Sequence, residues 1–256
     1  MASEVRHQVD TGQAYAVVRV TGVLDAATAP RVRSCLLGLL ADQPEALVVD
    51  VRQLTAGAPD AVAVLTDLAR DAADWPGCHL LLSASPGASA WRDTGLPVWP
   101  TPEEAIAALG APEPRRFLRA QLEPVVGAAR RSRELVTEAC ARWDLPDLAG
   151  PACIVITEMV NNVVAHAHTP MTVLFALRGE SMSVAVRDHS THVPRFTGSP
   201  VPVTSYGGRG LLLIDSVAQR WGSLPLDDGK VVWAVLDAGE SAGQLPSTGL
   251  AGHARG

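Results

Sequence analysis

Residues 157–170 read TEMVNNVVAHAHTP and contain three polar side chains, Glu158, Asn162 and His166, spaced four residues apart among apolar neighbours. On an α-helix, at about 100° per residue, this spacing places the three on nearly one face, one turn above another. Asn161 is turned about 100° away from that face, and we expect it to be a solvated or capping amide. The stretch therefore predicts an amphipathic helix with one polar face and otherwise apolar sides.

The oxygen atoms on this face are of the kind that magnesium binds. Mg²⁺ prefers a few hard oxygen ligands and keeps some of its waters, so the amide oxygen of Asn162 would suit it together with nucleotide phosphates. The carboxylate of Glu158 could accept a proton from an attacking hydroxyl or water as a phosphoryl group moves. Two plainer interpretations stay open: an ordinary polar helix face for Glu158 and Asn162, and a hydrogen-bonded core residue for His166.

Two later segments carry further features of a nucleotide site. The strand-like run that ends at residues 186–188 closes with Asp188, which can accept a hydrogen bond from the exocyclic amine of adenine. Residues 207–210, GGRG, open a helix. Glycines there let backbone N–H groups approach phosphate oxygens, and the helix adds its N-terminal partial charge. Taken alone, each segment is equally compatible with a plain turn.

The order of elements in the second half gives these segments their context. The apolar pattern predicts helices over 124–143, 150–166 and 211–218, and strands over 171–178, 181–187 and 230–236. Pro146 disfavours helix at the residue before it and is expected to separate the first two helices. Gly179-Glu180 is expected to join two strands as a hairpin. Residues 189–210 hold many prolines and glycines and predict a mobile loop.

In this order the motifs resemble the histidine-kinase-like ATPases. TEMVNNVVAHAHTP looks like the N-box helix of that superfamily, VRDHS (186–190) like its first glycine box, and GGRGLLLID (207–215) like its second. RWG (220–222) and GKVVWAVL (229–236) resemble the closing hairpin. The similarity is closest to the anti-sigma regulatory branch, whose members bind ATP and Mg²⁺ and often phosphorylate a serine on a small antagonist protein.

The resemblance implies roles for individual residues. It makes Glu158 the general base, Asn162 the magnesium ligand and Asp188 the adenine reader, and it adds His166, Gly208, Arg209 and Gly210 to the ATP-binding residues. Ser190 stands where the family's first box has glycine. We therefore expect the backbone near adenine to be arranged differently here.

The first half of the chain alternates strands and helices. Strands are predicted over 14–20, 46–51 and 79–83, and helices over 28–40, 60–72 and 101–110. The last helix has a capping signature, with Thr101 as N-cap, Pro102 in the first turn and Glu104 reaching back. This alternation predicts a small α/β layer structure for residues 10–110, and Pro112 and Pro114 mark the boundary after it.

VTGVLDAATAP (20–30) and LVVDVRQLT (47–55) resemble the STAS domains, which act as anti-sigma-factor antagonists. The phosphorylation loop of that family reads approximately Asp-Ser-Ser-Gly, whereas residues 58–61 here read APDA, without a hydroxyl. Asp60 either begins its helix at the positive dipole end or imitates the phosphorylated state with about one negative charge. If Asp60 imitates phosphoserine, we expect this half not to dock on the ATP-binding half.

Composition limits the partners and the compartment. A formal net charge of −6 without a long arginine run argues against direct nucleic-acid binding. No apolar stretch approaches the roughly 20 residues of a membrane span, and residues 1–11 are too polar for a signal peptide, so we expect a cytoplasmic protein with no membrane contact. The cysteines lack CxxC pairing and are expected to be buried, reduced thiols: Cys35, Cys78, Cys140 and Cys153.

We therefore expect an α/β protein with a STAS-like domain over 1–111, a Bergerat-type ATP-binding α/β sandwich over 112–239 and a disordered tail over 240–256. The expected function is that of an anti-sigma-factor-like protein-serine kinase in a partner-switching pathway. A sigma factor and/or a STAS-domain antagonist are its expected partners, and related kinases commonly form homodimers. The alternative is a non-catalytic module whose nucleotide sets partner affinity. Glu158 favours the kinase, whereas Ser190 and the Asp60 loop favour the module.

Overall fold

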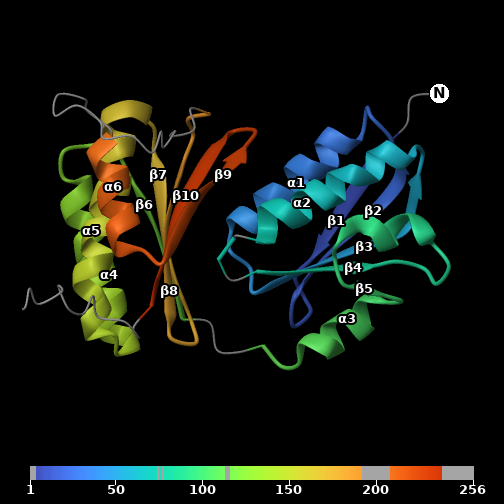
Figure 1. Ribbon diagram of the computed structural model, residues 1–256, viewed down its shortest axis with the longest axis horizontal. Helices are drawn as coiled ribbons and strands as arrows, with labels where there is room; N and C mark the ends of the chain where they lie inside the picture. The colour runs from blue at the N-terminus through green and yellow to red at the C-terminus, as the bar shows by residue number, and fades with distance from the viewer. Residues whose placement is uncertain (1–3, 74, 77, 113–115, 192–207, 238–256) are drawn as a thin grey trace, which may run out of the picture.

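The computed structural model describes residues 4–73, 75–76, 78–112, 116–191 and 208–237. They form two α/β domains that lie side by side, each built around a five-stranded sheet (Figure 1). The predicted fold class, a small α/β domain followed by an α/β sandwich, is confirmed. Most of the predicted loop over 189–210 and all of the predicted tail over 240–256 lie outside the described residues.

The N-terminal domain has helices on both faces of its sheet. Its strands are β1 (Val5–Asp10), β2 (Ala16–Leu24), β3 (Ala46–Ala56), β4 (His79–Ser83) and β5 (Val98–Trp99), and its helices are α1 (Ala29–Ala41), α2 (Ala63–Ala73) and α3 (Pro102–Leu109). Strand β1 pairs antiparallel with β2, and the other neighbours in the order β1-β2-β3-β4-β5 are parallel. Helices α1 and α2 cover one face and α3 the other (Figure 1). The first six residues of β3 are all buried, as expected for a strand covered on both faces.

Two polar features stabilise this domain. Thr101 caps α3 as predicted, because its Oγ1 accepts a hydrogen bond of 3.2 Å from the Glu104 backbone N–H. Asp50 lies in β3 with its carboxylate almost fully buried, and Arg52 donates to both of its oxygens at 2.9 and 3.0 Å. Burial alone would raise the pKa of Asp50, but the hydrogen bonds and charge of Arg52, together with Arg19, hold that pKa below its usual value.

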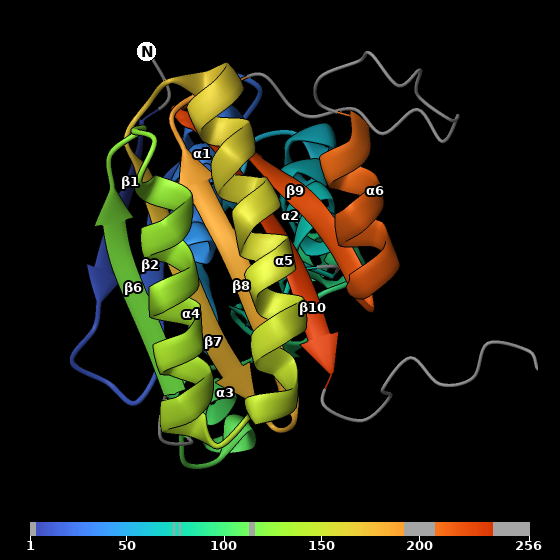
Figure 2. The ribbon, with the colours of Figure 1, turned by 90° about the vertical axis from the view of Figure 1, so that its left-hand side faces the viewer.

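The C-terminal domain is an antiparallel sheet with helices on one face. Its strands are β6 (Arg116–Leu122), β7 (Met171–Arg178), β8 (Ser181–Asp188), β9 (Arg220–Leu226) and β10 (Gly229–Asp237), and its helices are α4 (Ala128–Trp143), α5 (Pro146–Asn162) and α6 (Gly208–Val217). The strand order is β6-β7-β8-β10-β9, with every neighbouring pair antiparallel. Figure 2 shows the three helices in front of the sheet. We call this side the helical face and the opposite side the outer face.

Helix α5 begins at Pro146, four residues before the predicted start. The break before it is present, because Asp144 takes a left-handed conformation with φ of 61°. Proline is tolerated in the first turn of a helix, where its missing N–H has no intrahelical partner. Pro146 is therefore the first residue of α5 and not part of the segment that separates the two helices. The predicted hairpin at Gly179-Glu180 is confirmed, with Gly179 at φ of 56°.

A π-helical turn, Val163–Ala167, continues α5 without a gap. The resulting helix, Pro146–Ala167, has 22 residues and a mean hydropathy of 1.5 in its most apolar window, and within the described part of the chain it alone has the length and composition of a membrane span. Its buried side chains, however, are those of a core helix: Val155, Ile156, Met159 and Val160 pack against α4, α6 and the sheet. Packing inside the domain accounts for its apolar character.

The cysteines are free thiols, but only one of them is fully buried. Cys140 lies in the C-terminal core, and burial, followed by the neighbouring Cys153, raises the pKa of its thiol to about 11. The prediction of buried thiols is wrong for Cys35, Cys78 and Cys153, which are half-buried.

The N-terminal domain packs on the outer face of the C-terminal sheet. One apolar cluster runs through both domains and joins the core around α1 and α2 to Leu174, Ala185, Val231 and Trp233. Polar contacts border it: Arg119 donates to Asp42 at 2.9 Å, and Arg178 donates to the Glu45 carbonyl at 3.3 Å.

This contact overturns the expectation that the two halves stay apart. The contact does not use the loop at Asp60, whose side chain is exposed in the short 3₁₀ turn Pro59–Val62 before α2. Trp75, beyond the other end of that helix, makes the contact instead. An 11-residue helix spans roughly 16 Å, so Asp60 lies well away from Trp75. Imitation of phosphoserine by Asp60 is a separate matter and stays a prediction.

Candidate nucleotide-binding site

The second glycine segment lies against the polar face of α5. A Cβ atom added to Gly210 in α6 would lie 2.7 Å from Glu158 Oε2 and 3.7 Å from Asn162 Nδ2. Any larger residue at 210 would have to displace the Glu158 carboxylate, because 2.7 Å is closer than such atoms approach. The fold thus brings together Glu158, Asn162 and Gly210, three residues that the sequence had placed in one site.

The polar face of α5 ends at Asn162. Asn162 is half-buried and Asn161 is exposed, which agrees with the two faces predicted for them. His166 lies in the π-helical turn, closed by the His168 N–H donating to the Val163 carbonyl at 2.9 Å. A π-turn holds more residues than an α-turn, so the spacing of about 100° per residue does not extend to His166. Its side chain is exposed, and the interpretation as a core histidine is wrong.

Asp188 ends β8 as a buried carboxylate with a cationic partner. Lys230 Nζ donates to its Oδ1 at 2.9 Å, and the Ser190 backbone N–H donates to the same oxygen at 2.7 Å. Lys230 also donates to the Ser190 carbonyl at 3.0 Å. Because 1% of Asp188 and 7% of Lys230 is exposed, water screens this pair little.

The turn between β9 and β10 lies in close contact with the backbone at the end of β8 that carries Asp188. A Cβ on Gly229 would lie 2.0 Å from the Asp188 carbonyl oxygen and 2.8 Å from the His189 Cα. Only glycine allows that approach, and Gly229 has φ of 155°. The backbone around Asp188 is therefore held from two sides, by this turn and by the hydrogen bonds of Ser190.

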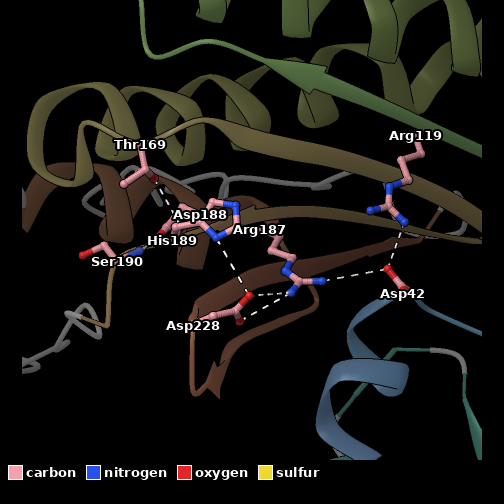
Figure 3. A network of polar contacts seen from close by, with 8 residues as sticks. All are labelled: Asp42, Arg119, Thr169, Arg187, Asp188, His189, Ser190 and Asp228. Carbon is pink, nitrogen blue, oxygen red and sulfur yellow. Dashed lines mark hydrogen bonds and ion pairs between the residues drawn. The ribbon is translucent and has the colours of Figure 1, made fainter. Parts of the chain in front are cut away.

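Figure 3 shows a polar network that continues from the site to the domain contact. Arg187 donates to Asp228 at 3.1 Å, and its guanidinium lies 4.0 Å from Asp42 of the N-terminal domain. At the other end, the His189 N–H donates to Thr169 Oγ1 at 3.2 Å and ties the residues after β8 to the end of the α5 helix. The end of β8 thus contributes to both the domain contact, through Arg187, and the candidate site, through Asp188.

Residues 121–236 match the family described as histidine kinase-like ATPase domain. The C-terminal domain belongs to this family. An uncharacterized protein of Streptomyces coelicolor is 36% identical over 94 residues, which are 36% of this chain and 85% of that protein.

Two solved structures are similar to parts of the chain. An anti-sigma factor antagonist from Mycobacterium paratuberculosis is 24% identical, with a TM-score of 0.36, over 41% of this chain and 93% of that one. A structure of RsbU and RsbW domains from Mycobacterium tuberculosis is 19% identical, with a TM-score of 0.36, over 50% of this chain and 32% of that one.

The phosphate side of the site fits the ligands of a histidine kinase-like ATPase domain. Asn162 offers an amide oxygen, and Glu158 a carboxylate one turn away on the same helix. Gly210 of α6 is buried beside these two residues, and because it has no side chain it leaves the space that a larger residue would fill. No group of three or more His, Cys, Asp or Glu side chains suited to a metal occurs in the described ranges. Magnesium at Asn162 would therefore depend on phosphate oxygens for its other ligands.

The fit of the part of the site expected to bind adenine is less simple. Asp188 ends its strand, where the resemblance of the sequence motifs expects an adenine reader, but Lys230 and Ser190 already engage its Oδ1. Both the N–H and the carbonyl of Ser190 take part in this arrangement, and a different backbone near adenine stays a prediction. An adenine amine would have to share the carboxylate with an ammonium group.

Lys230 is the residue that the sequence reasoning missed. It is the only lysine in the chain, which is a visible signal, and it opens a run of buried strand residues where a charge is unexpected. Its partner depends on strand register, which the sequence does not show. Of the other predicted residues, Gly208 and Arg209 open α6, but their surroundings, like those of residues 192–207, lie outside the described residues.

Proposed function

We propose that the chain is an ATP-binding regulator of a partner-switching, sigma-factor pathway, and that its C-terminal domain phosphorylates a serine of an antagonist protein. The observation that carries the proposal is the approach of Gly210 to Glu158 and Asn162 within a histidine kinase-like ATPase domain. This approach unites a carboxylate, an amide and a glycine-lined helix start, which are the parts that phosphoryl transfer requires.

Each residue has a defined task in this proposal. Asn162 holds Mg²⁺ through its amide oxygen, and the opening turn of α6, Gly208 to Gly210, faces the phosphates with its backbone N–H groups. Glu158 accepts the proton of the attacking serine hydroxyl. Magnesium supplies charge neutralisation at the phosphates when it is bound.

The N-terminal domain supports a regulatory role by its position. It covers the outer face of the C-terminal sheet and leaves the helical face, with the candidate site, to partners. The proposed partners are a sigma factor and/or a STAS-domain antagonist, in the cytoplasm. A homodimer would need a surface other than the outer face, because that face is already buried within the chain.

A non-catalytic module is the second candidate, and the Asp188–Lys230 pair favours it. If the base-reading carboxylate is committed to a lysine, nucleotide binding is weakened, and the protein can hold its partner without turnover. In that case nucleotide changes only the affinity for the partner.

The two candidates differ in phosphoryl transfer. We would measure Mg²⁺-ATP binding to the full chain by calorimetry and then offer STAS-domain antagonists from the same genome with labelled ATP. The kinase proposal expects label on an antagonist serine, and Glu158→Gln is expected to keep ATP affinity within a few fold while removing transfer. Binding without transfer to any antagonist would establish the module, and the absence of any binding would refute both.

A further inference from the structure

Lys230 and Asp188 are direct neighbours across two strands. Register pairs Lys230 of β10 with Asp188 of β8. Side chains alternate along a strand, and Val186 and Val232, two residues from each, lie in the core under the helices. Both charged groups therefore point to the helical face, the same side as Glu158 and Asn162.

The hydrogen bonds of this pair are largely accounted for. An ammonium group has three donors, and Lys230 gives one to Asp188 Oδ1 and one to the Ser190 carbonyl, which leaves one for a ligand. Asp188 Oδ1 already accepts from Lys230 and from the Ser190 N–H. The local surface thus offers a donor beside a carboxylate whose charge is neutralised.

We propose that Lys230 sets the base preference of the nucleotide site against adenine and toward a purine with an oxo group at the same ring position. This inference rests on the proposed function and on the role of adenine reader that the resemblance implies for Asp188. The amine of adenine is a donor and would have to use Asp188 Oδ2 beside an ammonium that already holds Oδ1, whereas an oxo group is an acceptor and receives the remaining N–H of Lys230. Lys230 is therefore a specificity-determining residue of the site.

A purely structural counter-ion makes a different prediction. A buried carboxylate without its partner is costly, so removing Lys230 lowers stability in either case. Only a specificity-determining lysine also changes the ratio of affinities for two nucleotides that differ at one ring position. That ratio, rather than stability or affinity alone, is the informative measurement.

The experiment compares ATP with inosine triphosphate, which carries an oxo group where ATP carries the amine. Binding of each, with Mg²⁺, is measured by calorimetry for the full-length natural protein, for Lys230→Met and for the matched control Lys230→Arg, which keeps the cation. We expect the natural protein and Lys230→Arg to bind inosine triphosphate at least as tightly as ATP. In Lys230→Met the ratio shifts toward ATP by about tenfold, the worth of roughly one hydrogen bond.

The outcomes separate this inference from the proposed function. If the natural protein binds ATP and Lys230→Met keeps the same ratio with a lower melting temperature, Lys230 is only a counter-ion and the inference is wrong while the function stands. If neither nucleotide binds to any variant, both are wrong. Should Lys230→Met fail to fold by circular dichroism, Lys230→Leu removes the donor with a different apolar side chain, and the same shift in ratio is required of it.

Discussion

Trp75 of the N-terminal domain meets Trp233 of β10 edge to face, with ring centroids 6.2 Å apart and planes at 80°. Both rings are almost fully buried, and Gly222 on β9 makes room for Trp233, since a Cβ there would lie 2.8 Å from the ring. Arg220 adds a cationic group 5.8 Å above the same ring. The two domains are therefore joined by close-packed aromatic side chains and not by ion pairs alone.

We expect Trp75→Ala to separate the domains. Truncating a buried tryptophan costs roughly 3–5 kcal/mol, whereas exposed ion pairs such as Asp42–Arg119 contribute about 1 kcal/mol or less. Solution scattering should show a larger radius of gyration. Trp99→Ala, at a half-buried tryptophan on the far side of the N-terminal sheet, is the control and should leave the radius unchanged. An unchanged radius in Trp75→Ala would show that other contacts hold the domains together.

Gly210→Ala should weaken Mg²⁺-ATP binding by about tenfold or more, because the added methyl group fills the space beside Glu158 and Asn162, the proposed magnesium ligand. Gly150→Ala is the matched control, since nothing lies within 4 Å of its Cβ position. In helix α5 that change should leave affinity unaltered and add up to about 1 kcal/mol of stability. Calorimetry and thermal unfolding test both variants, and equal affinities would contradict the assembled site.

Asn162→Ala should abolish Mg²⁺-dependent ATP binding without unfolding the domain, because its amide oxygen is the proposed metal ligand. Asn161→Ala should do much less, since that side chain is exposed on another face of α5. Titrations with and without Mg²⁺ measure both. Equal losses from the two substitutions would contradict the assignment.

Asp50 should make the stability of the chain depend on acid pH. Its pKa is lowered in the folded state, so the carboxylate stabilises the fold above its unfolded pKa of about 4. That contribution is lost as pH falls from about 4 through the folded pKa. Urea unfolding of Asp50→Asn should therefore show lower stability than the natural protein at pH 7 and a smaller difference at pH 3. A difference that is the same at both values would mean that Asp50 acts through shape alone.

Asp60→Ser should not change how the domains contact each other, because that contact lies beyond the other end of α2. The substitution restores a hydroxyl at the position where the STAS resemblance places a phosphate acceptor. We expect an unchanged radius of gyration and, if the C-terminal domain is an active kinase, incorporation of labelled phosphate. A more compact particle after the substitution would place Asp60 in a second contact.

The sequence predicted the elements whose apolar patterns are strong, and it missed those that lie at edges. Strands β4 and β7 have the bounds predicted for them. Strand β1 has one buried residue out of six, and β6 mixes half-buried and exposed positions without strict alternation, so neither had a clear period. Edge strands pair on one side only and need fewer apolar residues.

The candidate site divides in the same way. Glu158 and Asn162 follow from spacing within one helix, which local geometry determines. The meeting of Gly210 with them requires α6 to pack on α5, and the Asp188–Lys230 pair requires the register of strands that are 42 residues apart in sequence. Such long-range pairings have no local signature, so Lys230 was not recognised as the partner of Asp188.

The last two residues of β8 point in opposite directions, Arg187 toward Asp42 and the outer face, Asp188 toward Lys230 and the helices. Because successive side chains of a strand alternate, a shift of β8 by a single residue would exchange the two. Depending on the direction of the shift, either Arg187 would take the place beside Lys230, or Asp188 would take the place beside Asp42. An insertion or deletion in the hairpin at Gly179-Glu180 that shifts the register of β8 would therefore disturb the domain contact and the candidate site together.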